Sequence, residues 1–339
     1  MNRRSFNQAI LGSALILPNT LSMEKSKSSY LLPGDHVGLV CPASPITEER
    51  LNKAILNMES LGLVPVRGKN ILKQNGYLAG SDQERLQDLY EMYKDPSIKA
   101  IWCIRGGYGV THLLPYMDYK LVGSNPKLLI GYSDITGFHN AFYSILKMTN
   151  LHGPMASSDF TPYTVEQLKK VIFGNRGDSI QVRTCDENDI EFTTNGKSVF
   201  ERYVIHPGQA EGVLVGGNLS LLAAMCGTPY FKIKKHCILF IEDIEEAPYR
   251  VDRMITQLLQ VMDTTRIKGI LLGVFDGCER KDPATSSTLK EMMIERLAPL
   301  QIPCAYGFSF GHISNQCTIP LGAHAKMDSK DFSLQFELP

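Results

Sequence analysis

Ser133 lies between an apolar run and a helical pattern, in the short segment GYSD at 131–134. A serine on a sharp strand-to-helix turn can expose its hydroxyl as a nucleophile, and the helix N-terminus behind it favours a developing oxyanion. The usual Gly-x-Ser-x-Gly pattern is absent, because Ile135 occupies its last position. Serine and aspartate are also ordinary helix N-cap residues. The residues alone therefore leave two interpretations of Ser133, a nucleophile and an N-cap.

Glu242 and His312 are the candidate acid and base for such a nucleophile. Glu242 follows the apolar run 237–241, where a carboxylate can orient an imidazole and stabilise its cation. Further acids at 243, 245 and 246 leave open that Glu242 is a solvated loop acid. His312 follows Gly311, which allows a close backbone approach and leaves room for the ring. A lone histidine in a loop is nevertheless more often structural or exposed than reactive.

A glycine-rich turn, RGGYG at 105–109, follows another apolar run. Successive glycines leave backbone N–H groups free to bind an anion or an oxyanion. No Gly-Lys-Ser/Thr follows and no Gly-x-Gly-x-x-Gly is present, so neither a Walker loop nor a Rossmann fingerprint is predicted. The sequence also lacks HExxH and EF-hand patterns, and it therefore predicts no bound metal and no cofactor.

Apolar runs alternate with helical patterns in the first half of the chain. Strands are expected at 36–41, 63–66, 100–104 and 127–131, and helices at 48–61, 81–94 and 135–147. Strand–helix alternation at this spacing predicts a parallel sheet with helices on both faces. Thr47 is the expected N-cap of the first helix, because two acids then fall in the first turn, where the helix dipole favours them.

A polar stretch separates this half from a second block of apolar strands. Strands are expected in that block at 212–218, at 237–243 with acids at its end, and at 269–275. Helices are expected at 249–262 and 286–297, and short strands and turns from 304 onward. The predicted division has four parts: 1–29 as a signal or linker, 30–160 as an N-terminal α/β domain, 161–206 as a connecting region with a few weak strands, and 207–339 as a C-terminal domain.

The composition argues against several classes of protein. Of 339 residues, 43% are hydrophobic, which is enough for a buried core and favours two domains. Lys+Arg and Asp+Glu balance at 35 each, so no nucleic-acid partner is expected. The eight cysteines form no CxxC pair, which argues against zinc ribbons and thioredoxin-like motifs. Cys41, Cys103 and Cys237 lie in apolar runs and are expected as small buried hydrophobes.

The first thirty residues differ from the rest of the chain. Arg3 and Arg4 precede Phe6 and the mostly apolar run 9–17. That run is shorter than the ~20 residues needed to span a bilayer, and with the arginine pair it resembles a twin-arginine export signal. The sequence therefore predicts export to the periplasm, with contact to a membrane or to export machinery confined to this segment. A disordered start on a cytoplasmic protein is the alternative.

Six sequence blocks, taken together and in order, resemble the LD-carboxypeptidase family. They are RGGYG at 105–109, IGYSDIT at 130–136, HGP at 152–154, GGNL at 216–219, FIED at 240–243 with PYR at 248–250, and GH at 311–312 with PLG at 320–322. The resemblance runs from about Pro33 to about Phe336. The fold it implies is a flavodoxin-like parallel-sheet N-terminal domain with a smaller β-rich C-terminal domain.

The resemblance also implies roles for individual residues. Ser133 becomes the nucleophile, Glu242 the acid and His312 the base of a Ser–His–Glu triad. The expected oxyanion donors are the backbone N–H groups of Asp134 and of a glycine in the turn, Gly106 or Gly107. Arg105 is expected either to pair with the terminal carboxylate of the substrate or to brace its own loop.

The activity implied by the resemblance is cleavage of the L-to-D bond before a terminal D-alanine in murein tetrapeptides, during cell-wall recycling. Such enzymes are commonly cytoplasmic and are usually homodimers, so the export signal departs from the family.

Two rival functions remain open. One is the microcin C self-immunity branch, which cleaves peptidyl or aminoacyl nucleotides and stacks an aromatic side chain on the base. The single tryptophan, Trp102, lies in a predicted strand, which leaves Phe160, Tyr163 and Phe173 as substitutes. The other is a non-catalytic muropeptide-binding protein on the same fold, which the intact Ser, Glu and His disfavour.

Overall fold

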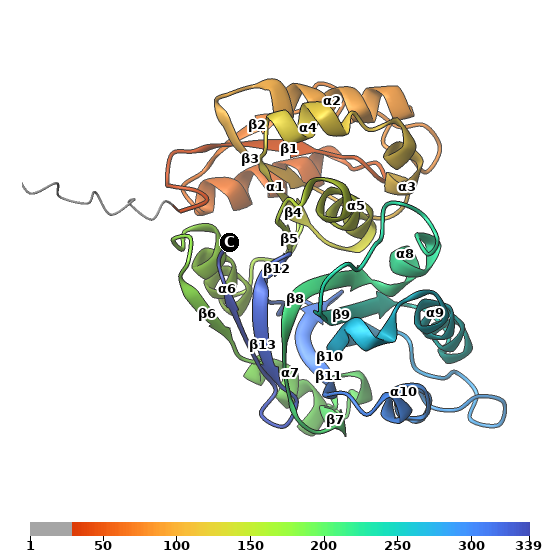
Figure 1. The fold of residues 1–339 in the computed structure, drawn as a ribbon. Helices are drawn as coiled ribbons and strands as arrows, with labels where there is room; N and C mark the ends of the chain where they lie inside the picture. Colours follow the sequence, from red (N-terminus) through yellow and green to blue (C-terminus); the bar gives the residue numbers. More distant parts are fainter. Residues whose placement is uncertain (1–28) are drawn as a thin grey trace, which may run out of the picture.

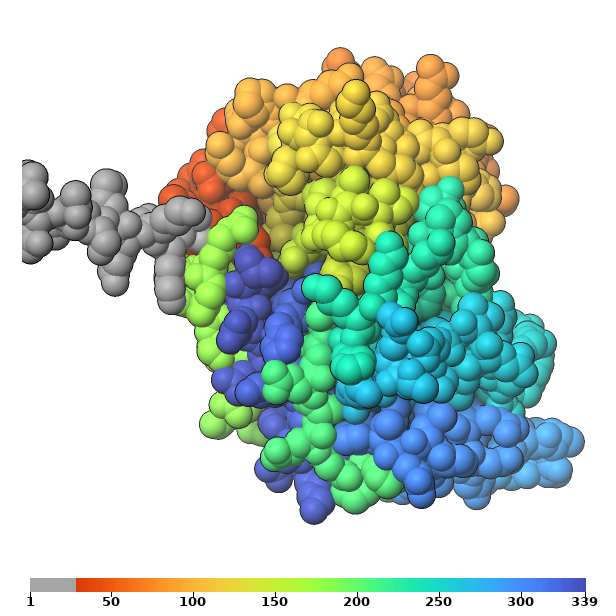
Figure 2. All heavy atoms as spheres, in the orientation of Figure 1, coloured from red at the N-terminus to blue at the C-terminus, as the bar shows by residue number. Residues whose placement is uncertain are grey.

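Two β-sheets organise the molecule and lie next to each other (Figure 1). The structure, a computed structural model, describes residues 29–339, and the predictions made for residues 1–28 lie outside that part of the chain. In Figure 2 the first half, coloured red to yellow-green, sits directly on the second half, coloured green to blue. Within residues 29–339, no helix is long and apolar enough to cross a membrane.

The first sheet has the strand order β12-β5-β4-β3-β1-β2. Its parallel strands are β1 His36–Val40, β2 Val64–Arg67, β3 Ile98–Cys103, β4 Leu128–Gly131 and β5 Asn150–His152. The helices between them are α1 Glu48–Ser60, α2 Asp82–Lys94, α3 Val110–Leu113, α4 Tyr119–Ser124 and α5 Thr136–Leu146. The order 2-1-3-4-5 is that of flavodoxin-like sheets, which confirms the predicted α/β class of this half.

Local capping explains where the long helices of this half begin. The Thr47 side chain accepts a hydrogen bond from the Arg50 N–H at the start of α1, which confirms Thr47 as its N-cap. Ser81 and Glu84 form a reciprocal capping box at the start of α2. Such bonds satisfy N–H groups that have no partner inside the helix, so residues close in sequence determine these helix ends.

The second sheet is mixed and has the order β6-β14-β13-β8-β9-β10-β11-β7. Its strands are β6 Ser179–Val182, β7 Tyr203–His206, β8 Gln209–Asn218, β9 Cys237–Ile244, β10 Ile267–Asp276, β11 Cys304–Gly311, β13 His324–Asp328 and β14 Ser333–Glu337. Strands β8 to β11 run parallel, and their helices are α8 Leu219–Ala224, α9 Pro248–Val261 and α10 Leu289–Leu297. Helix α10 begins later than expected, because Thr288 caps it with Glu291.

The stretch 161–206 contains more structure than its polar composition predicted. The weak strands are present as β6 and β7, and they form the two edges of the second sheet. Two helices, α6 Pro162–Ile172 and α7 Asp186–Thr193, were missed. The apolar side of α6 is narrow, with Leu168, Val171 and Ile172 buried, and charged residues on its other side hide that pattern in the composition.

The C-terminal part of the chain returns to the first sheet. Strand β12, Ile319–Leu321, pairs antiparallel with β5, with Leu321 opposite Asn150. The first sheet therefore depends on a segment distant in sequence.

All eight cysteines are free, and Cys41, Cys103 and Cys237 are buried as predicted.

Candidate active site

Ser133 occupies a strained turn at the carboxyl end of β4. It is the first residue of a short 3₁₀ turn, Ser133–Ile135, and its φ of 57° is in the left-handed region. Residues other than glycine rarely adopt this backbone conformation, and it persists only where the surrounding structure enforces it. The N-cap of the turn is Tyr132, so the N-cap interpretation of Ser133 is wrong. The turn presents the Ser133 hydroxyl to His312 instead.

His312 connects the serine to a buried acid. Its Nε2 lies 2.9 Å from Ser133 Oγ, and its Nδ1 lies 2.7 Å from Glu242 Oε2. Ser133 and His312 are 179 positions apart in the chain. His312 directly follows β11, and a Cβ added at Gly311 would lie 2.6 Å from the Val274 carbonyl oxygen and 3.3 Å from Glu242 Cβ. Glycine at 311 therefore permits the close backbone approach that the sequence suggested, chiefly to β10 and also to the acid.

Glu242 lies inside β9 and not at its end. The strand continues to Ile244, and the Glu242 side chain is fully buried. The expected placement at the strand terminus is therefore wrong, and so is the alternative of a solvated loop acid. The strand can continue past Glu242 because the next acid, Asp243, has hydrogen-bond partners there. Asp243 accepts hydrogen bonds from Asn218 Nδ2 at 2.9 Å and from Ser220 N–H at 3.0 Å. These bonds let two consecutive acids remain within a buried strand.

The charges of the Glu242–His312 pair stabilise each other. Burial on its own would raise the pKa of Glu242, but the His312 charge and hydrogen bond outweigh burial, and the pKa is lowered. Burial would lower the pKa of His312, but the charge and hydrogen bond of Glu242 raise it above its usual value. Burial and the Glu242 charge raise the pKa of Asp243 to about 6. The Glu242 carboxylate therefore favours the protonated form of His312.

The glycine turn lies directly against the serine. A Cβ added at Gly106 would be 3.0 Å from Ser133 Cβ and 3.1 Å from its Oγ. Gly107 has φ 103° and faces Ser44, whose hydroxyl accepts the Tyr108 N–H at 3.2 Å. Of the two predicted glycines, Gly106 is therefore the one next to the Ser133 side chain, whereas Gly107 packs against Ser44.

Asp134 joins the serine turn to the glycine turn. Its buried carboxylate accepts the Val110 N–H at 2.8 Å, at the start of α3. Burial raises the pKa of Asp134 to about 6. Sequence reasoning assigned a role only to its backbone N–H and missed this contact. The contact holds the two turns together, so that both face the same space.

Two hydrogen bonds join α5 of the first half to the end of β8 in the second half. Thr136 Oγ1, at the start of α5, accepts the Asn218 N–H at 3.0 Å. Asn140 Nδ2 donates to the Gly216 carbonyl at 2.9 Å. Gly217 packs against Thr136, where a Cβ would approach its hydroxyl to 2.5 Å. The segment GGN thus lets β8 lie against α5, which brings the serine of the first half to the histidine of the second.

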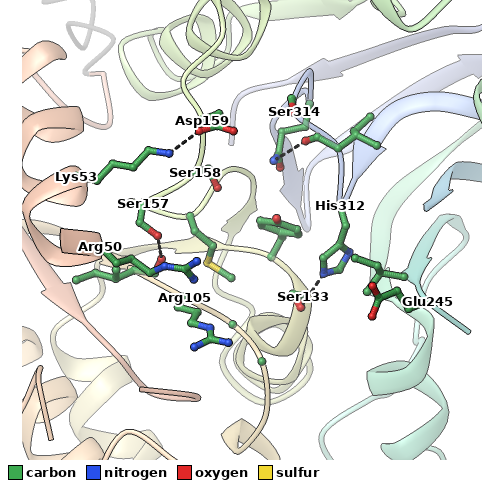
Figure 3. A pocket seen from close by; sticks show the side chains of 18 residues that line it. Arg50, Lys53, Arg105, Ser133, Ser157, Ser158, Asp159, Glu245, His312 and Ser314 are labelled. Carbon is green, nitrogen blue, oxygen red and sulfur yellow. Dashed lines mark hydrogen bonds and ion pairs between the residues drawn. The ribbon is translucent and has the colours of Figure 1, made fainter. Parts of the chain in front are cut away.

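Ser133 and His312 line a pocket of about 650 Å³ between the two halves (Figure 3). Arg50, Lys53 and Arg105 stand on one side of Ser133, and Glu245 stands on the other side near His312. The pocket is completed by Ile104, Gly106, Gly107, Tyr132, Met155, Ser157, Ser158, Asp159, Ile244, Ile313, Ser314 and Gln316. It could not be assembled from sequence, because its charged residues come from separate helices and turns.

Arg105 makes the bracing contact that the sequence left open. Its Nη1 donates to the Pro45 carbonyl at 2.7 Å, while the side chain also lines the pocket. Lys53 is paired with Asp159. Among residues 29–339, neither Arg105 nor Arg50 has a carboxylate partner, and no group of three His, Cys, Asp or Glu side chains is placed to hold a metal ion. The two guanidinium groups are thus available to an anion.

Trp102 is unavailable to any ligand. It is fully buried, and its indole N–H donates to the Pro154 carbonyl at 2.8 Å. Its ring lies 6.3 Å from that of Phe160, which is itself half-buried.

Comparison with known proteins agrees with this architecture. Residues 37–153 match the LD-carboxypeptidase N-terminal domain, and residues 211–327 match the LD-carboxypeptidase C-terminal domain. A Bacillus subtilis protein named "Probable murein peptide carboxypeptidase" is 37% identical over 305 residues, 90% of this chain and 92% of that protein. The Microcin C7 self-immunity protein MccF of Escherichia coli is 28% identical over 88% of this chain and 92% of its own length.

A solved structure shares the whole fold. The muramoyltetrapeptide carboxypeptidase from Oxalobacter formigenes superposes with a TM-score of 0.76 at 28% identity, and the match covers 89% of this chain and 98% of that one. Sequence and fold are thus shared over most of the length of both proteins. The chain belongs to the LD-carboxypeptidase family of serine peptidases.

Proposed function

We propose that this protein is a serine-type LD-carboxypeptidase that releases the terminal D-alanine of murein tetrapeptides, with Ser133, His312 and Glu242 as its catalytic triad. The observation that supports this most is the hydrogen-bonded series Glu242–His312–Ser133 at the wall of a pocket. The names of the related proteins support the substrate class.

The first half of the reaction is acylation of the serine. His312 Nε2 accepts the proton of Ser133 as Oγ attacks the carbonyl of the L-residue before D-alanine. Glu242 holds the ring through Nδ1 and stabilises the imidazolium. The backbone N–H groups of Asp134 and Gly106 bind the oxyanion, and each such donor contributes about 3 kcal/mol in well-studied hydrolases. His312 then protonates the amine of the departing D-alanine.

Hydrolysis of the acyl-enzyme completes the reaction. Water enters in place of D-alanine, and His312 removes its proton as it attacks the ester carbonyl. The tetrahedral intermediate uses the same oxyanion donors, and its collapse returns the proton to Ser133. The products are D-alanine and a tripeptide.

A carboxypeptidase must also bind a terminal carboxylate. Arg105 and Arg50 are suited to this role because both line the pocket and neither has a carboxylate partner among residues 29–339. The planar guanidinium matches a carboxylate with two parallel hydrogen bonds.

Mass spectrometry of murein tetrapeptide before and after incubation tests the proposal. We expect loss of one alanine residue with the wild-type protein and none with Ser133→Ala. A fluorophosphonate probe should label the wild-type protein and not the variant. Unchanged tetrapeptide together with an unlabelled serine would favour a non-catalytic muropeptide-binding protein.

The second candidate function is cleavage of a peptidyl nucleotide, which the similarity to MccF favours. Stacking on a base would require an aromatic side chain other than the buried Trp102. Tyr163, whose hydroxyl donates to the Arg183 carbonyl, and Phe173 are both half-buried. Incubation with an aminoacyl sulfamoyl adenosine, followed by the same mass analysis, distinguishes the two substrates.

We also propose that the protein is exported through its N-terminal arginine pair and acts on periplasmic murein as a homodimer. Fractionation of cells and light scattering of the purified protein test these two proposals separately. The alternative is a cytoplasmic location, in which the enzyme acts on imported murein fragments.

A further inference from the structure

Glu245 is an acidic residue of the pocket that the triad does not use. It follows β9 directly, is exposed, and lies on the His312 side of Ser133 (Figure 3). Within residues 29–339, its carboxylate has no hydrogen-bond or ion-pair partner. Its charge is therefore available to a ligand in the pocket.

The backbone holds Glu245 in an unusual conformation. Its φ is 56°, in the left-handed region, and its N–H donates to the Asp276 carbonyl at 2.8 Å. A Cβ added at Gly277 would lie 3.2 Å from Glu245 Cγ, so the turn after β10 packs against the side chain. A strained residue that its neighbours hold in place is commonly found at a functional site.

Apart from the Lys53–Asp159 ion pair, the positive and negative charges of the pocket lie on opposite sides of Ser133 (Figure 3). Arg50 and Arg105 lie on one side of Ser133, and Glu245 lies on the other (Figure 3). A ligand that places a carboxylate near the arginines would place its remaining part toward Glu245. Ile244, which precedes Glu245 in the chain, and Ile313, which follows His312, also line the pocket. The pocket thus offers apolar surface together with a negative charge, which suits an aliphatic chain that carries an ammonium group.

We propose that Glu245 is a specificity-determining residue that binds the side-chain ammonium of the residue whose carbonyl Ser133 attacks. The aliphatic part of that side chain lies along Ile244 and Ile313. The inference rests on the proposed function, in which the attacked residue is the third of the stem peptide. Lysine and diaminopimelate both carry the required ammonium, whereas neutral third residues lack it.

The test uses two synthetic tetrapeptides, L-Ala-γ-D-Glu-L-Lys-D-Ala and its Nε-acetyl-lysine analogue, both acetylated at the N-terminus. The lysine ammonium is then the single cation that differs between them. We expect the wild-type protein to have a kcat/KM about 5- to 10-fold higher for the free lysine, the effect of one partly exposed charge pair. Glu245→Gln should bring this ratio to about 1, because it should lower kcat/KM for the free-lysine peptide more than for the acetylated peptide.

Glu246→Gln is the matched control, because Glu246 is the next acid in the chain and pairs with Arg250 at 3.4 Å. It should keep the wild-type ratio. Equal rates of the wild-type protein on both peptides, or a preference that survives in Glu245→Gln, would overturn the inference but leave the carboxypeptidase function standing. Failure of the wild-type protein to release D-alanine from either peptide would reject the proposed function, and this inference with it.

Discussion

Glu242→Gln separates the charge of the acid from its shape. Glutamine has nearly the same volume and can still accept the hydrogen bond of His312 Nδ1, so the buried site should keep its packing. What is lost is the negative charge next to the imidazolium that forms when Ser133 attacks. Glu242 lies behind His312, fully buried, so the change should act on the rate and not on substrate binding.

The magnitude follows from the 2.7 Å contact between Nδ1 and Oε2. With the charge centres about 4 Å apart and an effective dielectric constant of about 20, the attraction is about 4 kcal/mol. At about 1.4 kcal/mol for each factor of ten, this predicts a fall in kcat of about 10³-fold. KM should change little, as expected when an interaction of the transition state is removed.

The pH dependence should change in a defined direction. His312 must be neutral to accept the Ser133 proton, so activity appears as pH rises through the His312 pKa. Glu242 raises that pKa. Removing the charge should lower the pKa and move the acidic limb of kcat/KM to lower pH.

The assay is D-alanine release measured by mass spectrometry across about pH 5 to 8, the range in which imidazole titrates. Glu246→Gln serves as the control, because it removes a carboxylate from the same segment that is paired with Arg250 instead of His312. A fall in kcat of less than about tenfold, an effect confined to KM, or an acidic limb displaced to higher pH would refute the assignment of Glu242.

Three further predictions concern the nucleophile, the oxyanion turn and the N-terminus. Ser133→Ala should abolish D-alanine release yet leave the melting temperature nearly unchanged in thermal denaturation, because the hydroxyl bonds to His312 at the wall of the pocket and contributes little packing. Gly106→Ala should reduce kcat by about 10²-fold or more, since its Cβ would lie 3.0 Å from Ser133 Cβ; activity equal to wild type would exclude this turn from the oxyanion site. Replacing Arg3 and Arg4 by lysine should retain the precursor in the cytoplasm, and an unchanged periplasmic fraction would reject export by this signal.

Much of the fold follows from local features of the sequence. Strand–helix alternation, together with the N-cap expected at Thr47, predicts the first sheet, because helix ends and strand periodicity depend on residues close in the chain. The same reasoning fails for α6, whose narrow apolar side is hidden among polar residues. It also cannot predict β12, because only the assembled sheet shows that a C-terminal segment pairs with β5.

The sequence by itself determined which side chains could react, since serine, histidine and glutamate stand next to strands in blocks that resemble a known family. It could not decide whether Ser133 caps a helix or attacks a substrate, because both roles use the same residue type at a strand-to-helix turn. The structure excludes the N-cap, because Tyr132 holds that position, and it places Ser133, with its left-handed φ, in contact with His312 of the other half. Tertiary structure alone also placed Glu245 opposite the arginines, because residues of a pocket are neighbours in space and not in sequence.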